Sequence, residues 1–526
     1  MSQRYSACWF LEIWVRTVEV RHGFLEQSAY FFPARPAVSE EGRVITYAQL
    51  NDEANRIATG LISEGISPGD LVALCAPNSA EWIASYFGII KTGATAVTLS
   101  SLLTGDELSN LITHGRPRFV MTQEAKLAEL ERLKKAGCIE KVICPGGDLD
   151  LESLKKKGTG SFQAVDRDRR DVAAVLYTGG TTGMPKGAML THEHTNFSSY
   201  SIAYYERSTE RDLALCFLPF NHVFGQLHIM NSTILSSGCL QLLPSFDMDR
   251  VLEVLKEGKI TKFFSVPTVY IRLLSLPDLD KQIGPLRYCF SAGASMAMEV
   301  VKQWRERTGI TIAESYGMTE AMPITFNHLH PQFHVVGSVG QACYGVEVQI
   351  RDTSGNILEP GHEGEICVHG RNVMNGYLGS PEETKATFWN AQKRQEDGWL
   401  RTGDIGIMDE HGYISIVDRL KDLIITGGEN VFPREVEEAL YTCPEVQEVA
   451  VVGVPDREWG EKVAAFIVPK PGETVVPDAL KSFLKKRLSG FKVPKLFVVV
   501  NELPKSQAGK ILKRDVKKQY LEGKKE

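Results

Sequence analysis

Short apolar runs that end in glycine, proline or serine recur along most of the chain. Runs such as "LVALCAP", "AAVLYTGG", "KFFSVPT" and "LRYCFSAG" have the length and the continuous hydrophobicity of buried strands. Longer stretches with helical spacing follow them, for example "EVVKQWRERTG". Because alternating strands and helices build a sheet covered by helices, this pattern predicts an α/β fold with largely buried strands.

The pattern changes beyond residue 400. "EHGYISIVDRLKDLI" is typical of a strand pair that leads to a charged joint. The segments "EVEEALYTCPEVQEVAVVGVPD", "KVAAFIVPKPG", "DALKSFLKKRL" and "KLFVVVNELP" then predict a compact α+β unit of roughly a hundred residues, within the usual size of a domain. A chain of 526 residues also exceeds what one core usually organises. We therefore expect a large domain over residues 1–418, a joint at 419–422 and a small domain over 423–526.

The composition is that of an ordinary globular protein, with 43% apolar residues. A formal net charge of −6 gives no general attraction to nucleic acid or to an anionic membrane, so we expect no nucleic-acid partner. The end of the chain is locally basic, "KILKRDVKKQYLEGKKE", and we interpret it as a mostly solvated helix rather than a nucleic-acid-binding segment.

The cysteines and the start of the chain bear on the cellular compartment. The ten cysteines are scattered, without a CxxC pair or a histidine grouping at metal-ligand spacing, and are typical of reduced thiols in a core. Charged residues interrupt the apolar start, which excludes a signal peptide and a membrane span: Glu12, Arg16, Glu19 and Arg21. We expect a cytoplasmic protein without a transmembrane segment, with an amphipathic surface anchor as the alternative, and we also consider a homodimer.

The stretch "VLYTGGTTGMPKGAMLTH" is the strongest candidate for a phosphate-binding loop. A GxxxxGK[ST] loop needs its lysine between a glycine and a hydroxyl residue, whereas Lys186 follows a proline and precedes a glycine. The glycines can still turn backbone N–H groups toward an anion, with Lys186 as a point charge. Hydroxyl donors come from Thr178, Thr181 and Thr182. Taken alone, the stretch would be better interpreted as a Gly/Thr-rich turn, because glycine-rich strings are common in the turns of α/β proteins.

Further motifs accompany this loop in a fixed order. They are "SAGASM", "ESYGMTE", "GEICVHGRNVMNGYL", "GWLRTGDIG", "VDRLKDLIITGGENVFPREVE" and "PKSQAGKILKR". With "YTGGTTGMPKG", they resemble the signature of the adenylate-forming enzymes, the superfamily of acyl-CoA synthetases, beetle luciferases and peptide adenylation domains. The resemblance covers the chain from about Arg43 to Arg514 and departs where many members have serine in place of Gly179.

The resemblance implies a large N-terminal domain of mixed sheets with flanking helices and a small, mobile α+β C-terminal domain. It also implies a two-step reaction: a carboxylate attacks the α-phosphorus of ATP to give an acyl-adenylate and pyrophosphate, and a thiol then displaces AMP. ATP, Mg²⁺ and CoA are the implied cofactor set, and a small-molecule carboxylic acid is the remaining substrate. Such chemistry depends on cations and fixed geometry rather than on a covalent protein nucleophile.

The resemblance also assigns the ATP site. Tyr316 would offer its ring to adenine, Thr319 a hydroxyl near the α-phosphate and Glu320 an oxygen ligand to Mg²⁺. Asp404 would accept the ribose hydroxyls, and Arg419 would donate to ribose or phosphate. The full set implied for ATP or AMP comprises Thr178, Gly179, Gly180, Thr181, Thr182, Gly183, Lys186, Gly293, Ala294, Glu314, Ser315, Tyr316, Gly317, Asp404 and Arg419.

Three features of the C-terminal part receive roles in the same way. Lys510, in "QAGKILK", would bridge the carboxylate and the α-phosphate during adenylation. Lys421, in "DRLKDLI", would be the hinge about which the small domain rotates between the two half-reactions. Gly427 and Gly428 would then line the path of CoA because they have no side chains to block it.

The acyl site is expected in "FLPFNHVFGQLH". His222 and Phe224 would flank the acid, with a further wall from Ala292, Gly293 and Gly317. Amino-acid-activating members carry an aspartate where this chain has Asn221, which cannot hold an ammonium group by charge. A non-amino acid with an apolar body, whether fatty, aromatic or alicyclic, is therefore the expected substrate of an acyl-CoA synthetase.

Three alternative functions remain open at this point. They are a ligase that loads a carrier protein, a luciferase-like oxygenase and a nucleotide-binding regulator without turnover.

Overall fold

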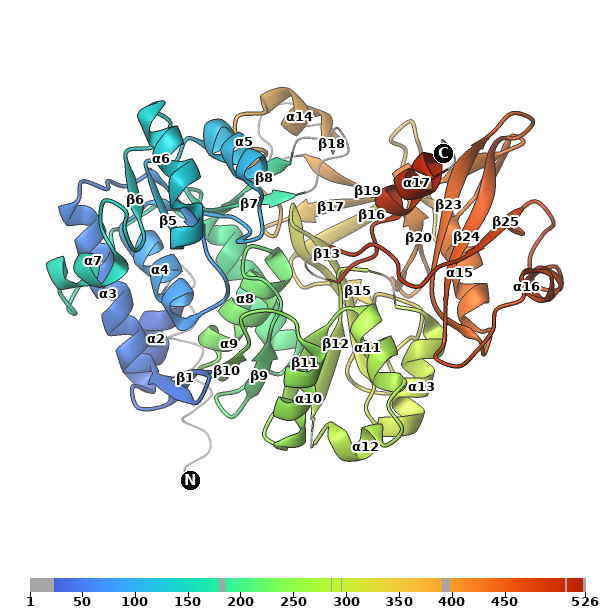
Figure 1. Ribbon diagram of the computed structural model, residues 1–526, viewed down its shortest axis with the longest axis horizontal. Helices are drawn as coiled ribbons and strands as arrows, with labels where there is room; N and C mark the ends of the chain where they lie inside the picture. The colour runs from blue at the N-terminus through green and yellow to red at the C-terminus, as the bar shows by residue number, and fades with distance from the viewer. Residues whose placement is uncertain are drawn as a thin grey trace.

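The computed structural model describes residues 23–178, 185–284, 286–294, 296–389, 398–506 and 509–523. These residues form four sheets with helices packed against them. In Figure 1 the first of the sheets lies at one end of the molecule and the C-terminal unit lies at the other.

A six-stranded sheet is built from the first half of the chain. Its strands are parallel except for the antiparallel pair β7–β8, and their buried positions follow the continuous apolar runs of the sequence. In spatial order they are β6 (Lys141–Ile143), β5 (Phe119–Thr122), β3 (Leu71–Cys75), β4 (Thr95–Thr98), β7 (Val172–Thr178) and β8 (Lys186–Thr191).

A nine-stranded sheet forms the centre of the molecule. It is parallel in the middle and antiparallel at both edges. In spatial order its strands are β15 (Gln341–Ala342), β14 (Ala321–Phe326), β13 (Ile312–Met318), β12 (Tyr288–Ser291), β11 (Lys262–Ser265), β9 (Leu213–Cys216), β10 (Cys239–Leu242), β1 (Pro36–Glu40) and β2 (Arg43–Thr46).

The helices that accompany these two sheets are set by local signals. α3 starts with a capping box between Thr46 and Gln49, and α13 ends at Gly309 with φ +74°. The helices are α2 (Phe24–Phe31), α3 (Tyr47–Ser63), α4 (Ala80–Lys91), α5 (Gly105–Gly115), η1 (Glu124–Lys126), α6 (Leu127–Lys135), α7 (Leu151–Lys157), α8 (His192–Tyr205), the π-helix η2 (Phe224–Asn231), α9 (Ser232–Leu235), α10 (Met248–Lys256), α11 (Pro267–Leu274), α12 (Leu279–Gln282) and α13 (Met298–Thr308).

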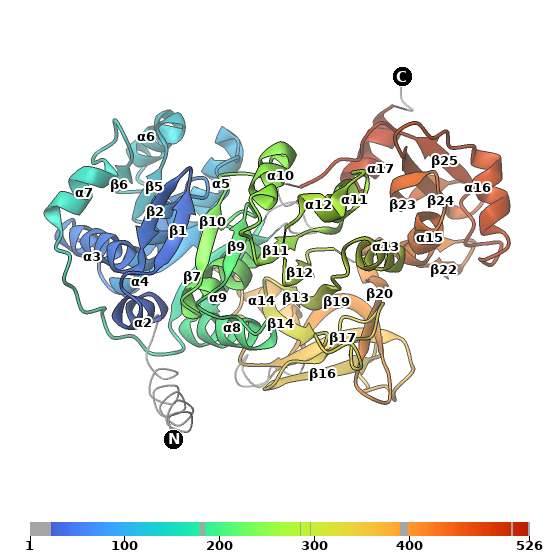
Figure 2. The same cartoon turned by 90° about the horizontal axis from the view of Figure 1, so that it is seen from below.

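A third, five-stranded sheet follows. Figure 2 shows its strands β16 and β17 beside β13 and β14, and a bridge between Ala321 and Val373 joins the two regions. Its elements are β16 (Val346–Arg351), β17 (Gly364–Gly370), α14 (Pro381–Ala386), β18 (Phe388–Trp389), β19 (Trp399–Met408) and β20 (Ile414–Arg419).

The C-terminal unit begins after the short helix η4 (Leu420–Asp422) and has its own sheet. Two clusters of buried apolar residues, drawn from residues 424–516, lie on the two faces of this sheet. Its elements are β21 (Ile424–Thr426), β22 (Glu429–Val431), α15 (Pro433–Tyr441), β23 (Val446–Asp456), β24 (Gly460–Pro469), α16 (Pro477–Leu484), β25 (Leu496–Val499) and α17 (Lys513–Glu522).

Two sequence expectations can be refined. The segment expected as a strand pair contains β20 and the start of β21, but β20 pairs with the upstream β19 and β21 belongs to the C-terminal sheet. The basic tail forms α17 as expected, yet Val516 is buried and the Tyr520 ring contacts Phe466 edge-on. The helix is therefore partly core rather than only a solvated extension.

The cysteines agree with the expectation of reduced thiols in a core, whereas the start of the chain, with Glu12, Arg16, Glu19 and Arg21, lies outside the described residues. All nine cysteines in the described ranges are free thiols, and seven of them are buried. Every helix within those ranges is too short or too polar to cross a membrane.

Candidate active site

The motif "ESYGMTE" forms the end of β13 and the turn into β14. Met318 pairs with Ala321 across this hairpin, so Thr319 and Glu320 are its two turn residues. Thr319 is half-buried and Glu320 is buried, and burial raises the pKa of the Glu320 carboxyl. The tight turn thus presents a hydroxyl and a carboxyl next to each other.

Tyr377 positions Glu320, and sequence reasoning missed it. The Tyr377 hydroxyl donates to Glu320 Oε1 at 2.8 Å, and the Met374 N–H donates to the Glu320 carbonyl at 2.8 Å. Tyr377 lies in the segment "NGYL", which the sequence analysis quoted as part of a motif without assigning it a role. Only the folded contact identifies it, because the two residues are far apart in the chain.

A second cluster centres on Asp404. The buried Tyr316 donates its hydroxyl to Asp404 Oδ2 at 2.5 Å, and Arg419 Nε lies 3.3 Å from Asp404 Oδ1. Asp404 and Arg419 are direct partners across the antiparallel pair β19–β20. The structure therefore joins Tyr316 of the nine-stranded sheet to Asp404 and Arg419 of the third sheet. The sequence analysis considered only the ring of Tyr316, whereas the structure also gives its hydroxyl a partner.

Lys510 reaches this cluster from the C-terminal unit. Burial, reinforced by the charge of Arg419, lowers the pKa of Lys510 to about 7, while Asp404 acts in the opposite sense. His222 has its pKa lowered to about 4, first by burial and then by the charge of Lys510. The Lys510 side chain is thus within electrostatic reach of both the Asp404–Arg419 pair and His222 of the segment expected to hold the acid.

Gly509 permits this approach. Its carbonyl accepts a hydrogen bond of 3.0 Å from Thr268 Oγ1 at the start of α11. Its φ is +81°, and a Cβ at this position would lie 2.9 Å from Cγ2 of Val266. Glycine is therefore needed both for the backbone conformation and for the close contact that brings Lys510 into the site.

The glycine-rich loop opens from the end of the pair β7–β8. Thr178 and Lys186 are register partners at its mouth, and the loop residues Gly179, Gly180, Thr181, Thr182 and Gly183 lie outside the described residues. Lys186 Nζ is 3.2 Å from Glu383 Oε1 and 5.3 Å from the centroid of the Tyr377 ring. Tyr377 also donates a hydrogen bond to Glu320, so Lys186 and Glu320 both lie next to the same tyrosine.

Other expected nucleotide-site residues lie on the same strand ends. Ser315 is half-buried and Gly317 exposed on β13, while Gly293 and Ala294 are exposed in the loop after β12. Gly293 has φ +82°, a conformation that favours glycine. Burial raises the pKa of Glu314 to about 8, and its Oε2 has no hydrogen-bond partner among the described residues.

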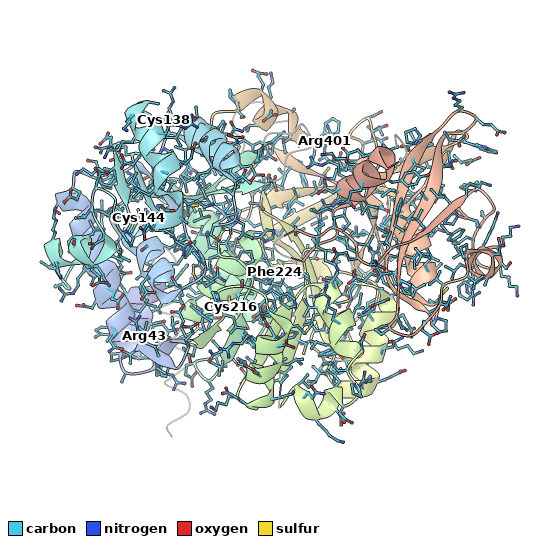
Figure 3. The ribbon with its side chains drawn as sticks, in the orientation of Figure 1. Arg43, Cys138, Cys144, Cys216, Phe224 and Arg401 are labelled. Atoms are coloured by element: carbon cyan, nitrogen blue, oxygen red, sulfur yellow. The ribbon has the colours of Figure 1, made fainter. Side chains whose placement is uncertain are left out.

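The expected acyl segment forms the buried π-helix η2 and the turn before it. The Phe224 N–H donates to His222 Nδ1 at 3.2 Å, Phe224 is buried, and Ala292 is half-buried on the loop after β12. Figure 3 labels Phe224 near the middle of the view. π-Helical turns are rare and are frequently found at functional sites.

The joint adjoins this cluster, since Arg419 belongs to both and the charges of Lys421 and Asp422 act on Lys510. Lys421 is exposed on η4, between the third sheet and the C-terminal sheet. Gly427 and Gly428 form the exposed two-residue turn of the β21–β22 hairpin, with φ +60° and +87°. The turn itself therefore requires glycines, and their role toward CoA stays a prediction.

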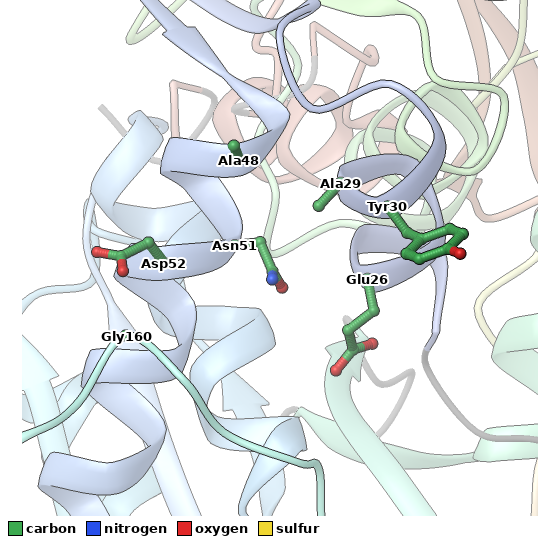
Figure 4. A pocket seen from close by; sticks show the side chains of 7 residues that line it. All are labelled: Glu26, Ala29, Tyr30, Ala48, Asn51, Asp52 and Gly160. Carbon is green, nitrogen blue, oxygen red and sulfur yellow. The ribbon is translucent and has the colours of Figure 1, made fainter.

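A surface pocket lies elsewhere. It has a volume of about 370 Å³ and is formed by α2, α3 and the loop around Gly160 (Figure 4). Glu26, Asn51 and Asp52 give it polar walls, and none of the residues discussed above lines it. The candidate site is thus the cluster at the ends of the central strands, not this pocket.

The site can be tested for Mg²⁺ from its oxygens. Among the described residues no three histidine, cysteine or acidic side chains are grouped to hold a metal ion. Glu320 offers a buried carboxyl to which the structure assigns a hydrogen bond at Oε1 only. A single carboxylate fits Mg²⁺, which is usually held by one or two carboxylates together with substrate phosphates.

Mixed sheets, a separate C-terminal α+β unit and a lysine of that unit placed beside an aspartate–arginine pair define an adenylate-forming enzyme. Family comparison agrees, with a match to "AMP-binding enzyme" over residues 25–378 and to "AMP-binding enzyme C-terminal domain" over residues 435–510. The chain belongs to the AMP-binding enzyme family.

Named relatives and a solved structure cover nearly the whole chain. A long-chain-fatty-acid–CoA ligase of Bacillus subtilis is 33% identical, with 93% of this chain and 92% of the relative aligned. A feruloyl-CoA synthase of an Amycolatopsis species is 35% identical, with coverages of 93% and 96%. ATP-bound MatB from Rhodopseudomonas palustris is 33% identical, covers 95% of this chain and 99% of its own, and superposes with a TM-score of 0.88, whereas the apo form gives 0.78.

Proposed function

We propose that this chain is an AMP-forming carboxylate–CoA ligase whose substrate is a non-amino carboxylic acid with an apolar body. One observation carries the proposal: Gly509 of the C-terminal unit packs against Thr268 and Val266 of the larger part. This contact brings the neighbouring Lys510 within electrostatic reach of Asp404, Arg419 and His222. An ammonium group within reach of a ribose-binding carboxylate and an acid-binding segment lies where a carboxylate and an α-phosphate have to meet. The named CoA ligases among the relatives support the same reaction.

The first half-reaction joins the acid to AMP. A carboxylate oxygen forms a bond to the α-phosphorus, the bond to the β-phosphate breaks, and pyrophosphate leaves. Lys510 reduces the repulsion between the two anions, Asp404 accepts the ribose hydroxyls, and Lys186 clamps the departing phosphates. Mg²⁺ bound at Glu320 would neutralise charge on the ATP phosphates.

The second half-reaction transfers the acyl group to CoA. The thiolate sulfur attacks the acyl carbon, the bond to the AMP oxygen breaks, and AMP leaves. Lys510 occupies the place at which the thiol has to enter, so we propose that the C-terminal unit rotates about Lys421 and turns Gly427 and Gly428 toward the site. The greater likeness to the ATP-bound than to the apo structure supports an adenylation orientation for the present arrangement.

The acid is constrained by the segment around η2. Asn221 provides no charge for an amino group, and the buried Phe224 gives the site an apolar wall. The test of the proposal is AMP release with ATP, Mg²⁺ and CoA across a panel of fatty, aromatic, alicyclic and amino acids. Acyl-CoA and AMP should form in equal amounts with at least one acid lacking an amino group, and activity confined to amino acids would refute the proposal.

Gly509→Ala is expected to slow adenylation by about 10- to 100-fold. The added Cβ meets Val266 at 2.9 Å and the backbone keeps a conformation that costs a non-glycine residue roughly 1–3 kcal/mol, so Lys510 withdraws from the site. Pyrophosphate exchange measures this step, and thioester formation from added acyl-adenylate should change less than threefold. Gly472→Ala is the matched control, since Gly472 has φ +83° and open space around its Cβ position. Equal losses of pyrophosphate exchange in both variants would mean that backbone strain alone, and not the contact between Gly509 and Val266, is responsible.

Lys421→Pro is expected to impair thioester formation at least about tenfold more than pyrophosphate exchange. Proline fixes φ near −65°, and a hinge residue has to change its backbone angles. The two half-reactions are measured separately, and Lys421→Ala controls for loss of the side chain. The hinge assignment is wrong if the proline variant slows both half-reactions to the same extent.

A further inference from the structure

A residue of the C-terminal unit caps the N-terminus of α13. Ala297 at the N-cap has no side chain that can accept a hydrogen bond. Instead, the N–H of Met298 donates to Oε2 of Glu438 on α15 at 3.3 Å, and Figures 1 and 2 both show the two helices side by side. A carboxylate here satisfies an N–H group and interacts favourably with the helix dipole. The cap of α13 is therefore supplied across the boundary between the two parts of the molecule.

Arg434 holds Glu438 against the joint between these parts. Its Nε lies 3.7 Å from Glu438 Oε1, and its guanidinium group donates to the carbonyl of Ile416. The Arg434 N–H also donates to Asp418 Oδ2 at 2.8 Å. Ile416 and Asp418 belong to β20, which ends where the joint begins. Glu438 is thus fixed beside the residues about which the C-terminal unit is proposed to rotate.

The start of α13 follows directly from the loop that is expected to hold adenine. Gly293 and Ala294 of that loop come after β12, and the buried Met296 and Ala297 immediately precede α13. The other face of α13 is packed into the core through Val300, Val301 and Trp304. Because closely packed elements move together, a shift of the first turn of α13 also shifts the loop before it.

The charges of α15 also act on β13, the strand that carries the expected nucleotide motif. Burial raises the pKa of the Glu314 carboxyl to about 8, with Arg434 acting in the opposite sense and Glu438 in the same sense. Glu314 is the register partner of Ser291 at the end of β12. The helix α15 is therefore within electrostatic reach of the strand ends from which the nucleotide loop and motif begin.

We propose, on the basis of the proposed function, that Glu438 couples the binding of ATP to the orientation of the C-terminal unit. In the present arrangement Glu438 caps α13 and so holds the adjoining loop in the position that the nucleotide needs. Rotation of the C-terminal unit breaks this hydrogen bond, which weakens nucleotide binding and favours the release of AMP after the second half-reaction. Docking of the unit and binding of ATP strengthen each other by the same factor, as linkage requires. Glu438 is a positioning residue, because it acts on the nucleotide through α13.

The test measures the Kd of ATP with Mg²⁺ by titration calorimetry on the full chain, without acid or CoA. Glu438→Ala should raise this Kd by about three- to tenfold, the range that loss of a helix cap produces in an equilibrium constant. The calorimetric stoichiometry reports the folded fraction separately, so a partly unfolded variant does not imitate the effect. In pyrophosphate exchange the KM for ATP should rise by the same factor, with kcat changed less than about twofold.

Two further variants identify the cause. Glu438→Gln should keep the Kd within about twofold of the unmodified value, because its amide oxygen can still accept from the Met298 N–H. Burial also raises the pKa of the Glu438 carboxyl, so a neutral side chain is tolerated at this place. Glu435→Ala is the matched control. Glu435 is an exposed residue of the same helix whose carboxylate pairs with Lys492 of the same unit at 2.6 Å, and its removal should leave the Kd unchanged.

An unchanged Kd in Glu438→Ala, or an equal rise in either Glu438→Gln or Glu435→Ala, would overturn the coupling. Those results would leave CoA-dependent AMP formation intact. The absence of AMP formation with every acid would instead refute the proposed function, while the ratio of the Kd values would still test the role of Glu438.

Discussion

Lys510→Ala is expected to lower the rate of acyl-adenylate formation at least about a hundredfold while leaving thioester formation from added acyl-adenylate within about threefold of the unmodified rate. The Lys510 side chain is within electrostatic reach of Asp404, Arg419 and His222, and in its protonated form it can hold two anions together. Removal of a charge that stabilises a transition state typically costs a factor of about 10²–10³. Acid-dependent exchange of labelled pyrophosphate into ATP measures the first step, and CoA-dependent consumption of synthetic acyl-adenylate measures the second.

The control for this variant is Lys518→Ala. Lys518 is an exposed lysine of α17, in the same C-terminal unit, so its removal changes the net charge equally without touching the site. It should leave both steps unchanged. A Lys510→Ala protein that loses both steps to the same degree would contradict the role of this lysine in adenylation alone.

Glu320→Gln is expected to reduce kcat/KM for adenylation by at least about a hundredfold and to shift the Mg²⁺ requirement to higher concentration. Glutamine has nearly the same shape and can still accept from the Tyr377 hydroxyl, so the turn stays intact while the negative charge is lost. Hard cations bind a carboxylate much better than a neutral amide. The measurement is a Mg²⁺ titration of pyrophosphate exchange at saturating ATP.

Glu382→Gln provides the comparison for this second variant. Glu382 is an exposed acid at the start of α14, the helix that also carries the partner of Lys186. The Mg²⁺ dependence of pyrophosphate exchange in the Glu382→Gln variant should match that of the unmodified chain. An unshifted Mg²⁺ dependence in Glu320→Gln would remove Glu320 as the metal ligand.

The strands were predictable because they are buried on both faces. "LVALC" and "KFFS" are continuous apolar runs, and each lies in the interior of a sheet as β3 and β11. Partners were less predictable: β20 and β21 are neighbours in sequence, yet they join different sheets. Apolar patterning determines that a segment is buried, whereas pairing depends on the whole topology.

The candidate site was likewise predictable only in part from the sequence. The residue types of Glu320, Asp404 and Lys510 and their motifs could be recognised in the sequence, but the hydrogen bond from Tyr377 to Glu320 and the contact of Gly509 with Val266 could not. Both depend on segments that are distant in the chain and meet only after folding.

The central claim, that a carboxylate of the substrate attacks the α-phosphorus of ATP, is tested most directly with an acid labelled with ¹⁸O in both carboxylate oxygens. The acid, ATP, Mg²⁺ and CoA are incubated with the full chain, and the products are separated and examined by mass spectrometry. The account predicts that each AMP formed carries one ¹⁸O atom and that pyrophosphate carries none. Label in orthophosphate or pyrophosphate, or AMP without label, would contradict it.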